Sequence, residues 1–370
     1  MRLLRLYGNT VIHLFLLLTS LSLAFLSLHC TRKQDVTLAL LMSFILILAV
    51  GLRYDSLDYE QYKYIYDNIS SFDYFSIFGY EIDPLTPIES GFYWLALFEK
   101  SISNHFYVFI FIVAIISIAM KLMAFEKLSP YICLSIFVYI CLDWYWKDLA
   151  QIRNGIATAF CLFSLVYLYN NEKIKYVFFI FIGSLFHLSS FIMFVSLFCR
   201  YLSYRLLYLL VAVSIIVAYF GGLGLILSDL FTLFGVSSTS RLVKYAEAGL
   251  YLEGMSLFGG TSLFYLMVLF LIVFFKEQLV SKWPKNELLI KVYIIGLSLT
   301  YLFIDYGILS GRISDMLVTP LLVVLLPSFM LLRNFDKYFC LALLSPYLLV
   351  WFFTLLNKSV EYKSILGFLI

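Results

Sequence analysis

The stretch FYVFIFIVAIISIAM, residues 106–120, contains no charged side chain. The apolar character continues on both sides of it, over residues 105–124. At 1.5 Å per residue, a helix of this length spans about 30 Å, which is the thickness of the hydrocarbon core of a bilayer. Polar and apolar residues do not alternate in the run, which excludes the strand of a membrane barrel. The stretch therefore predicts a transmembrane helix.

Runs of the same kind recur along the whole chain. Hydrophobic residues make up 63% of the 370 residues and charged residues 13%, whereas a soluble protein would be about half apolar and a quarter charged. We predict an all-α polytopic membrane bundle of about twelve spans, forming a single domain over residues 1–370. The segments at 130–142, 175–186 and 189–200 are too short to cross unaided and are expected to be tilted or half-helices. The predicted spans are 11–30, 36–52, 105–124, 130–142, 150–170, 175–186, 189–200, 205–220, 261–276, 288–305, 313–332 and 338–356.

The distribution of charge orients the predicted bundle. Lys and Arg residues gather around the short loops of one face, whereas Asp and Glu outnumber them on the other. Positive charge in short loops stays in the cytoplasm, so the long loops 53–104 and 221–260 are predicted to be extracytoplasmic. Shorter outer loops are expected at 143–153 and 305–312. Because long loops in a compact protein are usually functional, we expect the site on the outer face.

The first outer loop combines carboxylates with many tyrosines. Aromatic rings stack on the C–H faces of a pyranose, and carboxylates accept hydrogen bonds from its hydroxyl groups, so this composition suits sugar binding. The alternative is an aromatic belt at headgroup depth. Glu81 and Asp83 have the spacing with which some membrane glycosyltransferases hold a metal, although we predict no metal. The candidate residues of this loop are Arg53, Tyr54, Asp58, Tyr59, Tyr62 and Glu89.

Arginines at the outer ends of predicted spans suggest a site for an anion. Arg153 and Asn154 stand where a helix is expected to begin, Arg312 makes a similar helix entry, and Arg241 lies in the second long loop. A helix N-terminus favours anions, and an arginine adds a two-pronged grip on phosphate. Several such arginines facing one cleft would suit a diphosphate. The alternative is that they anchor the helices by reaching to the headgroups.

His187 stands where two short predicted segments meet on the outer side. A histidine in this place could take a proton from a hydroxyl group near neutral pH, although a lone histidine is more often structural. The chain has no Walker A, HExxH, GxSxG or Rossmann glycine pattern, and its net charge of +3 implies no nucleic-acid partner. We predict no cofactor.

Several short motifs resemble the EpsG/Wzy family of bacterial polysaccharide polymerases. In order and spacing they cover roughly residues 50–320, and Asn154 stands where the family often has glutamine. The matching pieces are Gly51-Leu-Arg53-Tyr54 with Asp58-Tyr59 and Tyr62, Glu89-Ser-Gly91-Phe92, Gln151-Ile-Arg153-Asn154-Gly155-Ile-Ala157, Phe186-His187-Leu-Ser189, Ser240-Arg241 with Tyr245, and Gly311-Arg312.

The resemblance implies a glycosyltransferase of the bacterial inner membrane that works on the periplasmic side. We predict that it needs no divalent cation, since arginines can neutralise the leaving diphosphate. It would join oligosaccharide repeat units carried on undecaprenyl diphosphate into O-antigen or capsule, with release of the lipid diphosphate. Membrane lipids, a chain-length regulator and a flippase are its expected partners.

That chemistry assigns roles to the candidate residues. Arg53, Arg153 and Arg312 would stabilise the leaving diphosphate or bind the nearby sugar. His187 would be the base for the attacking hydroxyl, and Asp58 or Glu89 would flank the glycosyl centre. Two other classes stay open. A lipid-linked oligosaccharide flippase should carry charges midway along its spans, and an O-antigen ligase or polyprenyl-phosphate-sugar glycosyltransferase would use similar outer loops.

Overall fold

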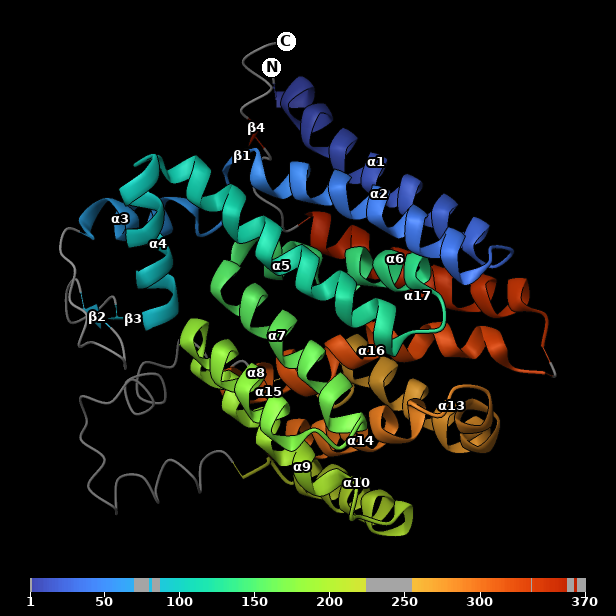
Figure 1. The fold of residues 1–370 in the computed structure, drawn as a ribbon. Coiled ribbons are helices and arrows are strands. Elements are labelled where there is room, and N and C mark those ends of the chain that lie inside the picture. The colour runs from blue at the N-terminus through green and yellow to red at the C-terminus, as the bar shows by residue number, and fades with distance from the viewer. Residues whose placement is uncertain are drawn as a thin grey trace, which may run out of the picture. The chain divides into compact units, whose positions relative to one another are not determined.

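The computed structural model describes residues 2–69, 80–81, 87–223, 255–333, 335–357 and 363–364. Nearly all of them lie in helices (Figure 1), which confirms the predicted all-α polytopic fold. The helices form two compact units, Met1–Phe191 with Val323–Ile370, and Ile192–Leu322. The interpretation of the chain as a single domain stays a prediction.

The first unit holds most of the helices and both pairs of strands. Strand β1 (Arg53–Asp55) pairs antiparallel with β4 (Lys363–Ser364), and β2 (Tyr80–Glu81) with β3 (Pro87–Ile88). Its helices are α1 (Arg2–Ser27), α2 (Arg32–Gly51), α3 (Tyr59–Asn68), α4 (Ser90–Ile102), α5 (Phe106–Leu128), α6 (Ile132–Leu142), the π-helix η1 (Tyr145–Ala150), α7 (Ile152–Tyr169), α8 (Lys173–Phe186), the 3-10 helix η3 (Leu326–Leu331) and α17 (Lys337–Asn357).

The second unit is built around one buried helix. Nearly every residue of α14 (Asn286–Leu302) is buried, and its neighbours include α10, α13 and α15. The other helices of this unit are α9 (Ser196–Cys199), α10 (Tyr204–Tyr219), α13 (Gly260–Lys282) and α15 (Gly307–Leu317). Two helices cross the boundary between the units, η2 (Leu188–Val195) and α16 (Thr319–Leu325).

Every predicted apolar segment falls on a helix. Among the described residues, six helical runs are long and apolar enough to cross a membrane: α2, α5, α7, α13, α17 and the run Gly307–Leu331. The segments that we expected to be too short are indeed short helices, namely α6, α8 and η2 with α9. The number of crossings stays a prediction, because short apolar helices such as α6 and α10 need neighbours or a local thinning of the bilayer to span it.

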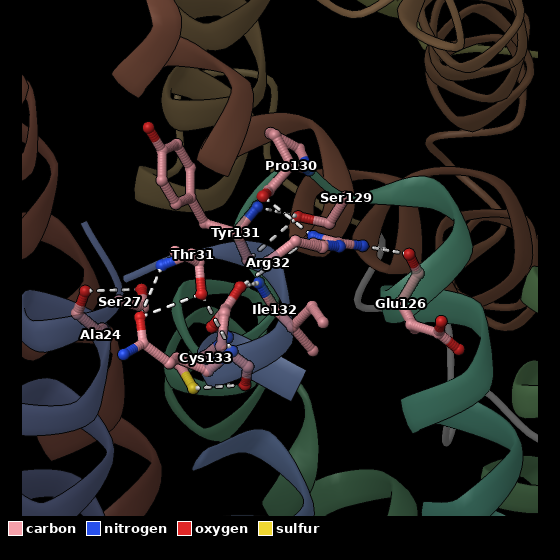
Figure 2. Close-up of polar contacts among 12 residues, drawn as sticks. Ala24, Ser27, Thr31, Arg32, Glu126, Ser129, Pro130, Tyr131, Ile132 and Cys133 are labelled. Atoms are coloured by element: carbon pink, nitrogen blue, oxygen red, sulfur yellow. Dashed lines mark hydrogen bonds and ion pairs between the residues drawn. The ribbon is translucent and has the colours of Figure 1, made fainter. Parts of the chain in front are cut away.

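Polar contacts join the ends of three helices on the predicted cytoplasmic side (Figure 2). Asp35, in the first turn of α2, accepts a hydrogen bond from the Ile132 backbone N–H at 2.7 Å. This carboxylate therefore caps the N-terminus of α6, whose first N–H groups have no partner within their own helix. Arg32 donates to the carbonyl oxygens of Pro130, at 2.9 Å, and Glu126. The start of α2 is thus tied to the end of α5 and the start of α6.

Residues 143–153 do not form the outer surface loop that we predicted. They continue from α6, which is buried along its whole length, into the π-helix η1, where Lys147 and Asp148 are 1% and 2% exposed. Lys121 is also buried, within α5. The loop prediction failed because Asp148 is paired with Lys121 inside the bundle, whereas an interpretation of the sequence alone places charged side chains in water.

The predicted first outer loop contains regular secondary structure. Helices α3 and α4 both lie within 53–104 and pack against α5. Tyr59 and Tyr66 of α3 place their rings 5.1 and 5.4 Å from that of Phe106. These two tyrosines are therefore part of an aromatic core between α3 and α5.

Candidate functional site

The first turn of α7 carries Arg153 and Asn154, so this predicted helix entry is confirmed. Arg153 Nη1 forms an ion pair with the Oε2 atom of Glu89, the residue that directly precedes α4. The guanidinium carbon of Arg153 lies 5.7 Å from the centre of the Tyr62 ring, which belongs to α3. Three predicted site residues from separate segments therefore meet, and we name them the Arg153 cluster: Tyr62, Glu89 and Arg153.

The Arg153 cluster is partly open. The side chains of Arg153 and Glu89 are 21% and 17% exposed, whereas Tyr62 is buried. Burial raises the pKa of the Tyr62 hydroxyl, and the charge of Arg153 acts against that rise. Tyr62 is consequently a neutral phenol near pH 7, and its ring supports the guanidinium by a cation–π contact. A phosphate oxygen that reached Arg153 would compete with Glu89 for the same guanidinium fork.

His187 lies at the same level of the bundle as Arg153. A Cβ placed on Gly183 of α8 would stand 3.3 Å from the Ala157 carbonyl oxygen of α7. The antiparallel neighbours α7 and α8 are joined by a short turn in which Asn171 adopts a left-handed φ of 64°. One helical turn outward from this contact, about 5.4 Å, α7 reaches Arg153 and α8 reaches His187.

The start of α4 reaches the same place. A Cβ on Gly91 would stand 2.7 Å from the Leu185 carbonyl oxygen, so only glycine permits α4 to approach α8 this closely. Glu89 precedes this contact by two residues, and His187 follows it by two. The starts of α4 and α7, which the charge pattern predicts to lie on the outer side, therefore both pack on the last turns of α8, the helix that ends beside His187.

Ser189 orients the His187 ring. Its hydroxyl oxygen lies 2.7 Å from His187 Nδ1, and its backbone N–H donates to the same nitrogen at 3.3 Å. When Nδ1 carries the proton and donates a hydrogen bond to the hydroxyl, the basic lone pair is on Nε2, where it can act as a general base. The backbone N–H favours the opposite tautomer. Reasoning from the sequence assigned no role to Ser189, and its position two residues after the histidine was the only signal.

Asn154 and Arg53 have structural partners. Asn154 is 1% exposed and donates from Nδ2 to Gln151 Oε1 at 3.1 Å, which holds the first turn of α7 together. Arg53 is also 1% exposed, and its Nη1 donates to the Val50 carbonyl oxygen at 2.7 Å. It therefore satisfies one carbonyl at the C-terminal end of α2, where a positive charge is favourable.

The remaining predicted site residues of the first outer loop belong to β1, to α3 or to the residue that precedes α3. Asp58 precedes α3 and is close enough to Tyr62 to raise the pKa of its hydroxyl, after the larger effects of burial and Arg153. Tyr54 is half-buried in β1, and Tyr59 is buried against Phe106. The ring of Tyr59 contributes packing in this structure, and its contact with a sugar stays a prediction.

Arg312 is not at a helix entry, contrary to our prediction. It lies more than one turn inside α15, which begins at Gly307, and forms an ion pair with Asp315 at 3.6 Å. It belongs to the second unit, so its joint action with Arg153 stays a prediction.

Arg241 and Asp83 lie outside the described residues, as does the side chain of Glu81. Across the parts of the chain that the structure describes, no group of three His, Cys, Asp or Glu residues could hold a metal ion.

Comparison with known proteins gives one match. The model of the EpsG family matches residues 36–367, nearly the whole chain. No curated protein and no solved structure matches.

Proposed function

Since the chain belongs to the EpsG family, we propose that it is a polymerase of bacterial cell-surface polysaccharide. Its substrates are oligosaccharide repeat units carried on undecaprenyl diphosphate, and it works at the outer face of the inner membrane. The observation that supports this proposal best is the Glu89–Arg153 ion pair at the starts of α4 and α7, two helices that pack on the last turns of α8 beside His187. It combines an anion-binding group, a carboxylate and a base, which are the groups that glycosyl transfer from a diphosphate requires.

In the proposed reaction, a hydroxyl oxygen of one lipid-linked unit attacks the anomeric carbon of the growing chain. The bond from that carbon to the diphosphate oxygen breaks, and its electron pair leaves with the lipid diphosphate. His187 takes the proton of the attacking hydroxyl through Nε2, while Ser189 holds Nδ1. Arg153 stabilises the negative charge that develops on the leaving diphosphate.

Glu89 has two tasks in this scheme. In the described structure it balances the charge of Arg153. When a diphosphate occupies the guanidinium fork, the carboxylate is released and stands near the glycosyl centre, where positive character builds in the transition state. Asp58, before α3 and near Tyr62, is the second candidate for that role. Arginine can neutralise the leaving diphosphate, so the proposed reaction needs no divalent cation.

The flippase alternative predicted charges midway along the spans, and the structure contains such charges. Lys121 and Asp148 lie in the interior of the bundle, paired at 2.8 Å, with side chains 5% and 2% exposed. Charges that line an open path for a lipid-linked sugar would be accessible, so this buried pair does not support the flippase. An O-antigen ligase or a polyprenyl-phosphate-sugar glycosyltransferase would use a site of the same composition, and only the product separates these classes.

The polysaccharide ladder of a deletion strain tests the proposal. Loss of a polymerase leaves a single repeat unit attached to the lipopolysaccharide core or to the lipid carrier, because synthesis and transport of the unit continue. Loss of a flippase or a ligase leaves no attached unit. We expect the single-unit product, and a strain without any attached unit would contradict the proposed function.

A further inference from the structure

A buried ionic network joins α5, α6 and η1. Asp148 Oδ1 accepts hydrogen bonds from Lys121 Nζ at 2.8 Å and from Ser117 Oγ at 2.6 Å, and its Oδ2 accepts one from the Tyr139 hydroxyl. Lys121 also donates to Ser117 Oγ at 2.6 Å. The carboxylate is thus satisfied on both oxygens, and we name these four residues the Asp148 network: Ser117, Lys121, Tyr139 and Asp148.

The position of the Asp148 network makes it costly to maintain. Ser117 is the central residue of α5, a helix long enough to cross the membrane. Charged side chains at that depth are expensive and usually have a function. A buried ion pair is also often no more stable than well-packed apolar residues of similar volume. Stability alone therefore does not explain why this pair is present.

The network is connected directly to the start of α7. A Cβ placed on Gly155 of α7 would stand 2.3 Å from the Lys147 carbonyl oxygen and 3.1 Å from Asp148 Oδ1, so η1 lies against the first turns of α7. The Gln151 N–H, just before α7, donates to the Trp146 carbonyl oxygen of η1 at 2.8 Å. Single-turn π-helices are frequent at functional sites. Fixing Asp148 therefore fixes the place where α7 begins.

We propose that Lys121 and Asp148 are positioning residues for Arg153. The pair holds η1 inside the bundle, η1 holds the first turn of α7 through Gly155, and that turn carries the guanidinium of Arg153. The inference rests on the proposed function, in which Arg153 grips the lipid diphosphate. Breaking the pair displaces the guanidinium, so catalysis is lost while the protein remains folded.

The test compares variants that separate charge from fold. Asp148→Asn keeps one acceptor oxygen, for Ser117 or for Tyr139, but leaves the Lys121 charge without its counter-ion. Combining it with Lys121→Met removes both charges, which should restore the amount of protein in the membrane. Lys121→Arg keeps the ion pair and should keep activity. The matched control is Lys127→Met with Glu126→Gln, which removes an exposed ion pair at the end of the same helix.

Purified variants are assayed with lipid-linked repeat units, and kcat and KM are measured separately. For the Lys121→Met/Asp148→Asn protein we expect normal membrane levels, a roughly tenfold or larger fall in kcat, and a KM within about twofold of the wild type. Normal levels with normal kcat would overturn the inference.

If that protein does not accumulate, Tyr139→Phe decides, because it removes one hydrogen bond to Asp148 and no charge. A lower kcat at normal levels supports the inference, and an unchanged kcat overturns it.

Arg153→Lys in the same assay separates this inference from the proposed function. If Arg153→Lys is inactive while the Lys121→Met/Asp148→Asn protein is normal, only the positioning role fails. If Arg153→Lys is fully active, the proposed role of the Arg153 cluster fails, and the positioning role with it.

Discussion

At Arg153 a single guanidinium faces both a carboxylate and an aromatic ring. Glu89 holds one side of the fork, and Tyr62 lies beside it at 5.7 Å. The planar shape of arginine makes both contacts possible, since it binds two oxygens at once and also stacks on rings. An anchor that only reaches the headgroups would need neither contact. This geometry supports the prediction that Arg153 binds an anion, and lysine substitution separates that role from anchoring.

We predict that Arg153→Lys collapses the polysaccharide ladder toward a single repeat unit, with normal protein levels in the membrane. Lysine keeps the charge but lacks the fork, and losing one charge-assisted contact of ~1.5–3 kcal/mol slows the reaction roughly ten- to a hundredfold. The matched control is Arg205→Lys at an exposed position in the first turn of α10, which should leave the ladder unchanged. A full-length ladder from Arg153→Lys would show that the residue is only an anchor.

We predict that Ser189→Ala lowers turnover by roughly tenfold or more, and that Ser189→Thr restores it. Without the hydroxyl, the backbone N–H of residue 189 is left as the partner of His187 Nδ1. That donor holds the proton on Nε2, so the ring cannot act as a base there. Threonine retains the hydroxyl and with it the basic Nε2. Turnover of the purified variants measures the effect, and full activity in Ser189→Ala would exclude the proposed base.

The sequence identified the members of the Arg153 cluster but not their contacts. Arg153 and Glu89 were each predicted from their place near a helix start and an outer loop. Their ion pair joins positions 64 residues apart, and it depends on Gly91 letting α4 approach α8. The close approach of two helix backbones does not change the pattern of hydropathy or charge along the sequence, so only the folded structure reveals it.

Among the elements, the connection from α6 through η1 to α7 departs most from expectation. Its charged residues indicated a loop, because hydropathy averaged along a sequence counts every charged side chain as exposed to solvent. Burial of Asp148 is possible only because Lys121 stands opposite it on α5, 27 residues earlier. The long apolar runs, by contrast, were predictable element by element, since each satisfies its own backbone hydrogen bonds as a helix.

Close contacts between helix backbones predict the effect of glycine substitutions. Gly91→Ala would place a Cβ 2.7 Å from the Leu185 carbonyl oxygen, so α4 must move away from α8 and carry Glu89 with it. We expect a lower Tm in detergent and a shorter ladder. Gly260→Ala, at the start of α13, meets no atom within 4 Å and serves as the control. Equal Tm values for the two variants would contradict the packing of α4 on α8.

At the scale of the whole molecule, charge predicts which face is outside. Basic residues of the short connections include Arg32, which ties α2 to α5 and α6 on the predicted cytoplasmic side. The outer ends of α4, α7 and α8 form the candidate site on the opposite side. The orientation and the site are therefore linked, because reversing the topology would move the site into the cytoplasm.

Reporter fusions test this orientation. We predict periplasmic activity for fusions at Ser71 and Gly249, which belong to the predicted outer loops and lie outside the described residues. A fusion at Asn171, in the turn between α7 and α8, should be active only as a cytoplasmic reporter. Cytoplasmic activity at Ser71 would overturn the assignment and the mechanism that depends on it.

The central claim is that this chain alone joins lipid-linked repeat units. The direct measurement reconstitutes the purified protein in vesicles with repeat units on undecaprenyl diphosphate, in excess chelator, and resolves the products by size. We predict a ladder of polymers and release of undecaprenyl diphosphate, both lost in Arg153→Lys. Polymerisation that returned only with Mg²⁺ or Mn²⁺ would indicate metal ligands such as Glu81 and Asp83. Repeat units that crossed the bilayer without being joined would contradict the account.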